Sequence, residues 1–132
     1  MIINQKLLDQ LSAQAKVNPR LRQNYDLRTS SEDQSQRMLN ALEPGTVLPI
    51  HRHTKSTETL VMVRGKLIER FYDDNGDVIQ EVFMQACGEN VILQIPVGQW
   101  HSLEVLEEGT IIFEAKDGAY EPLYEADTLI KS

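Results

Sequence analysis

The sequence predicts an all-β fold, a sandwich or barrel, preceded by a short N-terminal α-helix. After Gln36 the chain becomes a series of short runs rich in Val, Ile, Leu, Thr, Phe and Tyr. Pro, Gly, Asn and Asp interrupt these runs at the intervals typical of antiparallel β structure. A length of 132 residues suits one hydrophobic core. We therefore expect one structural domain, with residues 1–35 as a helix and polar loop packed on a barrel of residues 36–132.

The predicted helix spans residues 4–15. Leu7, Leu8, Leu11 and Ala15 recur there at helical spacing among polar residues, and Pro19 prevents any continuation. Residues 19–37 are polar and follow neither a helical nor a strand period. This pattern predicts a loop with one extended piece.

Eight strands are predicted after this loop. They cover residues 37–43, 47–53, 58–64, 66–72, 78–84, 91–95, 100–106 and 110–115. Asn75-Gly76 predicts a hairpin with a type I′ turn, because both residues tolerate a positive φ. Residues 107–109 predict a second tight turn. Eight short strands with little helix favour a sandwich or barrel.

Composition excludes several classes of partner. The formal net charge is −7, with 13 basic and 20 acidic residues, so we expect no binding to nucleic acid. The N-terminus lacks a signal-peptide pattern, and no apolar run approaches the roughly 20 residues of a membrane helix, so we expect no membrane partner. The single cysteine, Cys87, fits a reducing cytoplasm and is interpreted as a small buried hydrophobe.

The stretch PIHRHTKSTETLVMVRG, residues 49–65, holds two of the three histidines in the chain. On a strand, His51 and His53 point to the same side. Glu58 begins the next predicted strand, and His101 begins another after a turn at PVGQW. Three imidazoles and a carboxylate without thiolate suit a catalytic first-row divalent metal ion. Fe(II), Mn, Zn, Ni and Cu all remain open.

The segment GTVLPIHRHTKSTETLVMVRG resembles the first motif of the cupin superfamily. From Gly45 to Gly65 it has a glycine, five residues, His-x-His, four residues, a glutamate, six residues and a glycine. The second motif is looser: GENVILQIPVGQWHSLEV supplies P-x-G-x-x-H, but has one extra residue before the proline, and Val105 where the family often has asparagine. The resemblance implies a small jelly-roll barrel with one metal ion inside its mouth, bound by His51, His53, Glu58 and His101.

A narrower resemblance covers the N-terminal half. The short helix, PRLRQNYDLR and QRMLNALEPGTVLPIHRH are similar to the WbuC-like cupin fold metalloproteins, which are often associated with bacterial cell-surface polysaccharide synthesis. This resemblance does not supply a molecular activity. Small cupins often pair through sheet edges or faces, so it also implies a homodimer.

Five polar residues of the N-terminal half are candidates for binding a small-molecule ligand. The arginines either form a solvated surface or reach over the barrel mouth to hold an anionic group, for which guanidinium is well suited. Neighbouring hydrogen-bond donors would assist them. The candidates are Arg20, Arg22, Asn24, Tyr25 and Arg37.

Charges on and beside the predicted strand 66–72 are interpreted as exposed. Arg64, Lys66, Glu69 and Arg70 are typical of strand charges that protect a sheet edge, so we assign them no chemistry. Beyond the ligands, no free His or Cys is placed to act as a general base. A tyrosine, another carboxylate or a metal-bound hydroxide would have to serve.

These observations support three functional hypotheses. The first is a metal-dependent isomerase, epimerase, lyase or dioxygenase acting on a small polar metabolite such as a sugar or sugar acid. The second is a non-catalytic module that binds a metal ion or small ligand. The third, a metal-free epimerase with a His-Asp pair, is disfavoured by the intact ligand pattern. Arginines and a non-ligand acid or tyrosine facing the mouth would favour catalysis, whereas a mouth sealed by Leu and Met would favour a structural metal.

Overall fold

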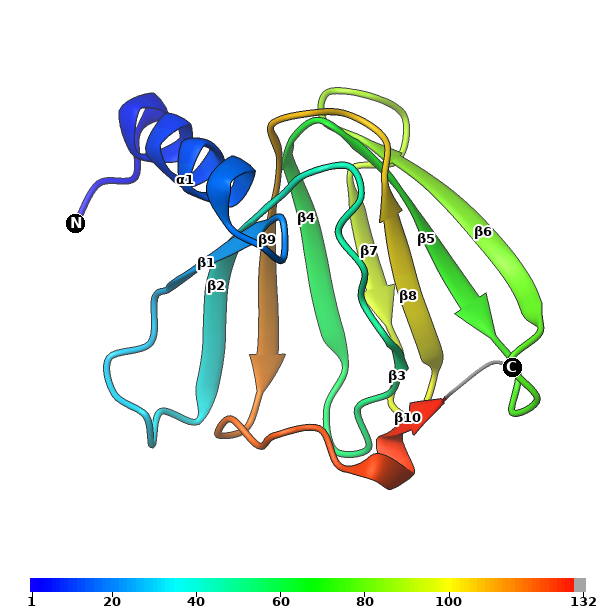
Figure 1. Ribbon diagram of the computed structural model, residues 1–132. Helices are drawn as coiled ribbons and strands as arrows, with labels where there is room; N and C mark the ends of the chain where they lie inside the picture. The colour runs from blue at the N-terminus through cyan, green and yellow to red at the C-terminus, as the bar shows by residue number, and fades with distance from the viewer. Residues whose placement is uncertain (130–132) are drawn as a thin grey trace.

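Two antiparallel five-stranded sheets face each other in the computed structural model, which describes residues 1–129 (Figure 1). One sheet has the order β1-β2-β9-β4-β7 and the other the order β10-β3-β8-β5-β6. The elements are α1 (Gln5–Val17), β1 (Arg22–Asp26), β2 (Ser35–Leu42), β3 (Ile50–His51), β4 (Glu58–Arg64), β5 (Lys66–Tyr72), β6 (Val78–Gln85), β7 (Ile92–Ile95), β8 (Trp100–Val105), β9 (Thr110–Asp117), the 3₁₀ helix η1 (Glu125–Asp127) and β10 (Thr128–Leu129). The all-β prediction and the N-terminal helix are confirmed. The end of the predicted barrel region, residues 130–132, lies outside the described residues.

The space between the sheets changes from apolar to polar along the strands. At one end lies a buried cluster of Leu42, Leu60, Met62, Leu67, Met84, Val105 and Ile112. Because alternate strand residues share a face, the side chains that follow Leu60 and Val105 toward the other end are Glu58 on β4 and Leu103 and His101 on β8. The apolar end therefore stabilises the fold, and the polar end is available for a site.

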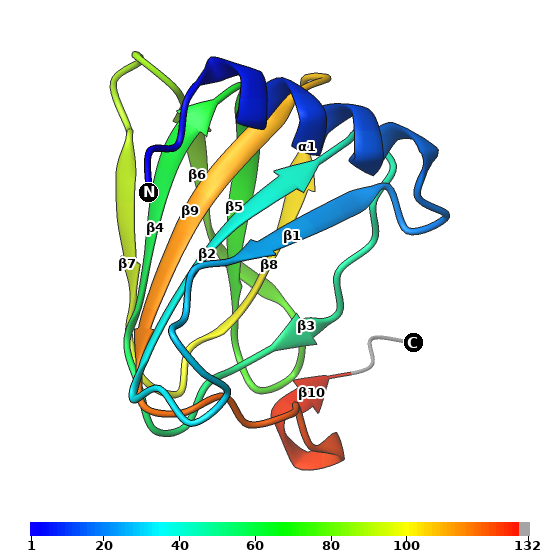
Figure 2. The same cartoon turned by 90° about the vertical axis from the view of Figure 1, so that its left-hand side faces the viewer.

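The helix α1 packs on the outer face of the first sheet (Figure 2). The Asn4 side chain caps it by accepting a hydrogen bond from the N–H of Leu7 at 3.0 Å. Its buried face forms a second core with β2 and β9, consisting of Leu8, Leu11, Ala15, Leu39, Ala41 and Ile111. Each buried leucine contributes roughly 2 kcal/mol to this attachment. Among residues 1–129 no helix is long and apolar enough to cross a membrane.

The polar segment before residue 37 contains the predicted extended piece, which is β1. It pairs antiparallel with β2, with Asn24 opposite Asn40. The predicted strand 47–53 is reduced to the two residues of β3. Pro49 has no N–H for a sheet ladder, and the carbonyl of Val47 accepts a hydrogen bond from the Arg22 side chain at 2.9 Å instead.

Two local predictions need correction. The hairpin at Asn75-Gly76 is present, but only Gly76 has a positive φ, so the turn is not type I′. The Asp73 carboxylate accepts the N–H groups of Asn75 and Asp77 and fixes a wider turn. Cys87 is exposed in the turn after β6 and is not a buried hydrophobe.

The join between β4 and β5 depends on Gly65, which has φ +83°. A Cβ atom at this position would lie 2.7 Å from the backbone Cα of Thr110, which cannot move freely. Gly109 has φ +74°, and apart from its two chain neighbours no other residue of the described part of the chain has an atom within 4 Å of the equivalent Cβ. Substitutions at the two glycines can therefore distinguish the cost of backbone strain alone from the cost of strain with an added steric clash.

We expect Gly109→Ala to lower the free energy of unfolding by about 1 kcal/mol through φ strain. Gly65→Ala should lower it by roughly 3 kcal/mol or more, because overpacking adds to the same strain. Urea denaturation of both variants beside the parent measures the difference. Equal losses of unfolding free energy would show that the β9 backbone moves away from the added Cβ atom without an energetic cost.

Candidate metal centre and ligand cavity

The three histidines meet at the polar end of the barrel. His51 on β3 pairs directly with His101 on β8, and His53 follows β3. The ring centroids of His51 and His101 are 4.2 Å apart, and His53 lies 5.1 Å from His51 and 5.5 Å from His101. One ligand atom from each of the three lies within 4.8 Å of the other two. This cluster is able to bind a metal ion.

Hydrogen bonds to backbone carbonyls orient two of these rings. Nδ1 of His51 lies 2.9 Å from the carbonyl oxygen of Pro49, and Nδ1 of His101 lies 3.0 Å from that of Gln99. Because a carbonyl oxygen only accepts, Nδ1 carries a proton in each ring, and in the neutral ring Nε2 is then the nitrogen with the free lone pair. This is the tautomer that a metal ion requires.

Burial favours the neutral form of His51 and His53 and surrounds the inner nitrogens of the cluster with protein. Burial is the largest cause that lowers the pKa of both His51 and His53 to about 4. Within residues 1–129, Nε2 of His53 and Nε2 of His101 are buried and have no hydrogen-bond partner. Since native proteins rarely leave such atoms unpaired, the donor set fits a metal ion.

Glu58 lies beside the three histidines at the start of β4. Its Oε2 is 3.4 Å from Nε2 of His101, and its Oε1 is 4.0 Å from Nζ of Lys116. Burial opposes ionisation of this carboxyl, but the neighbouring His101 and Lys116 outweigh it and lower the pKa of Glu58 to about 2. An ionised carboxylate is thus held next to the imidazoles, although it is not one of the three groups within 4.8 Å.

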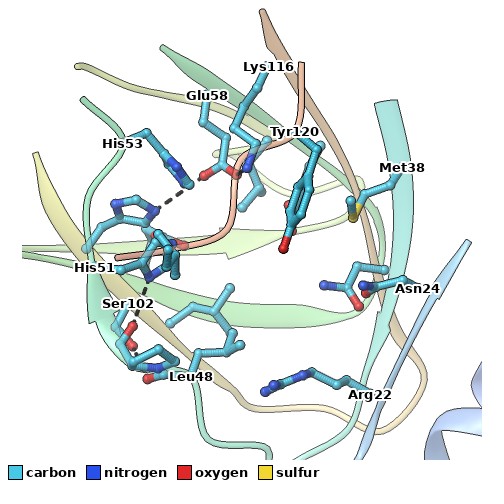
Figure 3. Close-up of a pocket in the computed structure, with 18 of the residues that line it drawn as sticks. Arg22, Asn24, Met38, Leu48, His51, His53, Glu58, Ser102, Lys116 and Tyr120 are labelled. Atoms are coloured by element: carbon cyan, nitrogen blue, oxygen red, sulfur yellow. Dashed lines mark hydrogen bonds and ion pairs between the residues drawn. The ribbon is translucent and has the colours of Figure 1, made fainter. Parts of the chain in front are cut away.

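The histidines form one wall of a cavity of about 420 Å³ between the sheets. Figure 3 shows His51, His53 and Glu58 on one side, and Arg22 with Asn24 on the other. The segment after β9 covers part of the mouth: Tyr120 points into the cavity, and Glu121 forms a 2.9 Å ion pair with Lys55. The volume lies within the range of about 300–1,000 Å³ that is usual for small-molecule sites.

Arg20, Arg22 and Asn24 line this cavity, as the ligand-binding hypothesis requires. Among residues 1–129 neither of these two arginines forms an ion pair with a carboxylate. Burial, and then the neighbouring charge of Arg20, lower the pKa of Arg22. The other five of the seven arginines are all paired: Arg28, Arg37, Arg52, Arg64 and Arg70.

The other two ligand-binding candidates have contacts elsewhere. Tyr25 packs in the second core under α1, because it is next to Asn24 on β1 and so faces the opposite side of the sheet. Arg37 pairs with Asp33 at 3.0 Å and donates to the carbonyl of Ser35. Neither residue lines the cavity with the histidines.

Two further acids line the cavity and were not among the candidates. Glu69 on β5 is only 1% exposed, so its interpretation as an exposed strand charge is wrong. Glu69 shares a strand face with the buried Leu67 and Phe71, and this alternation could have predicted that its side chain points into the barrel. Burial is the largest cause that raises the pKa of Glu69 well above its usual range and the pKa of Glu114, on β9, to about 8.

Several solved structures resemble this fold. The capsular polysaccharide assembling protein CapF from Staphylococcus aureus is 25% identical, with a TM-score of 0.66 over 86% of this chain. The chain spans only 30% of the length of CapF. KdgF from Halomonas sp. is 13% identical, with a TM-score of 0.61 over 77% of this chain and 83% of KdgF. An oxalate oxidase in complex with the substrate analogue glycolate is 14% identical, with a TM-score of 0.63 over 82% of this chain and 56% of its own.

These neighbours are cupins, and they confirm the jelly-roll fold that the two sequence motifs imply. A comparison with curated proteins finds no match. The model of one family, described as "Domain of unknown function (DUF6016)", matches residues 3–84, which is more than half of the chain. The chain is therefore a cupin and belongs to this family.

Proposed function

We propose that this cupin is a metal-dependent enzyme acting on a small, hydroxylated, anionic metabolite of the sugar-acid class. One divalent transition metal ion would be held by His51, His53 and His101, with Glu58 as the fourth ligand. A metal ion in such a site polarises a carbonyl or hydroxyl group of a bound ligand. The chain's own residues would bind and orient the ligand beside it.

The observation that carries this proposal is the placement of the unpaired arginines. In a chain of net charge −7, carboxylates are available to pair with every arginine, and five of the seven are so paired. The two without such a partner line the same cavity as the histidines. Holding two guanidinium groups near each other is unfavourable unless an anion lies between or beside them. We infer that the ligand supplies this anion.

Two further observations support catalysis over a purely structural metal. Glu69 and Glu114 are non-ligand acids at the cavity, and Tyr120 points into it. Polar and charged side chains form much of the lining among the described residues, so leucine and methionine of this part of the chain do not seal the mouth. The similarity to CapF, a capsular polysaccharide assembling protein, supports a sugar-related ligand.

Metal binding is tested by elemental analysis of untagged protein after reconstitution with Fe(II), Mn, Zn, Ni or Cu. The parent should retain about one metal ion per chain through desalting, as a site with this donor set does. His51→Ala and His101→Ala should lose it, whereas Lys66→Ala, on the far end of the barrel, should not. A parent without bound metal, or His variants that keep it, would refute the proposed centre.

Anion binding is tested with D-gluconate and its neutral counterpart D-glucitol, titrated calorimetrically into metal-loaded protein. We expect a preference for gluconate, and a loss of about 10–100-fold in its affinity in Arg20→Gln and Arg22→Gln, because each removes a charge-assisted hydrogen bond. Arg64→Gln is the matched control, since Arg64 pairs with Asp9 outside the cavity. If all three variants bind gluconate like the parent, the arginines have no role in ligand binding.

Turnover separates an enzyme from a binding module. Metal-loaded protein incubated with aldonates and uronates should convert at least one of them, as seen by NMR of the mixture. Conversion should stop in His101→Ala. Ligands that bind the parent tightly and are recovered unchanged would instead support the non-catalytic alternative.

A further inference from the structure

The cavity contains a second set of unpaired polar atoms apart from the histidines. Within residues 1–129, five buried side-chain nitrogen or oxygen atoms have no hydrogen-bond partner. Four of them belong to residues that line the cavity: Nε2 of His53, Nε2 of His101, Oδ1 of Asn40 and Oε2 of Glu69. The imidazole nitrogens fit the metal ion, which leaves the two oxygens unexplained.

These two oxygens belong to opposite sheets. Asn40 lies on β2 beside Asn24 of β1, on the side of the unpaired arginines. Glu69 lies on β5 opposite Leu103 of β8, two residues from His101, on the side of the histidines. Asn40 is 8% exposed and Glu69 is 1% exposed, so bulk water does not satisfy either group. A ligand that extends from the arginines to the metal centre would pass both.

The chemistry of the two oxygens selects the group that would satisfy them. Oδ1 of Asn40 only accepts hydrogen bonds, and a carboxyl oxygen accepts when ionised or donates when protonated. A hydroxyl group suits both, because it donates and accepts. An ammonium group is a poorer match, since it only donates hydrogen bonds and so cannot accept one from a protonated carboxyl.

We propose that Asn40 and Glu69 form a hydroxyl-binding subsite and select a ligand with hydroxyl groups along its chain, such as an aldonate or uronate. This inference rests on the proposed function in that the same cavity must accept a small anion. It adds that the anionic group alone does not give a ligand its full affinity for the cavity. The hydroxyls in the middle of the ligand, away from both the carboxylate and the metal ion, would account for the preference.

A buried polar group that serves a ligand costs stability in the free protein, whereas one that serves the fold adds to it. The two roles therefore predict opposite effects of an apolar replacement. Glu69→Leu should leave the melting temperature unchanged or raise it, while weakening ligand binding. A structural role of Glu69 predicts a lower melting temperature. Asn40→Leu should weaken ligand binding as well, but its melting temperature does not distinguish the two roles, because the Asn40 side chain also hydrogen-bonds Glu114.

The test compares D-gluconate with 2-hydroxyhexanoate, which keeps the carboxylate and the α-hydroxyl but lacks the distal hydroxyls. Affinities are measured by calorimetry with metal-loaded parent and variants. The parent should prefer gluconate by at least about 10-fold, the value of roughly one or two buried hydrogen bonds. Glu69→Leu and Asn40→Leu should reduce this preference to near unity without changing the affinity for 2-hydroxyhexanoate.

Two controls complete the design. Glu69→Gln keeps hydrogen-bonding atoms at the same place and should retain most of the preference. Met62→Leu changes a buried core residue that does not itself line the cavity, and it should leave the preference intact. A parent that binds both acids equally, or leucine variants that keep the preference, would overturn the subsite. Loss of metal binding or of all anion binding would instead refute the proposed function.

Discussion

The pairing of His51 with His101 is the contact on which the site depends. It is the one residue pair that joins β3 to β8 within the described chain. On its other side β3 is held by β10, where Thr128 lies opposite His51 and the N–H of Arg52 donates to the carbonyl of Asp127 at 3.1 Å. A two-residue strand between two neighbours thus fixes the distance between imidazoles that come from positions fifty residues apart in sequence.

The rest of the barrel supports this arrangement by dividing its interior. The apolar cluster at one end provides the hydrophobic stabilisation, and the second core attaches α1 to the outside of the same sheet. The other end holds ionisable and unpaired polar groups that weaken the free protein. Such groups persist where a ligand or metal ion satisfies them, and their concentration around one cavity is the main structural sign of function.

Much of the fold and part of the site could be predicted from the sequence, because alternation and turn residues report directly on strands. All eight expected strands are present, and the histidines converge as their positions in the strands imply. Glu69 was predicted to be exposed because it lies among the charged residues Arg64, Lys66 and Arg70, and charged residues are usually exposed. Its alternation with the buried Leu67 and Phe71 indicates the opposite, that it points into the barrel. Tyr25 could not be separated from Asn24, since their opposite orientations appear only once β1 is recognised as a strand.

The central claim is that the three histidines, with Glu58 beside them, bind one metal ion inside the barrel. Anomalous diffraction from crystals of the reconstituted protein, recorded at the absorption edge of the bound metal, tests it directly. We predict one peak about 2.0–2.2 Å from Nε2 of His51, His53 and His101 and from a carboxylate oxygen of Glu58. A peak at the protein surface, or a fully reconstituted crystal with no peak among the three imidazoles, would contradict the account.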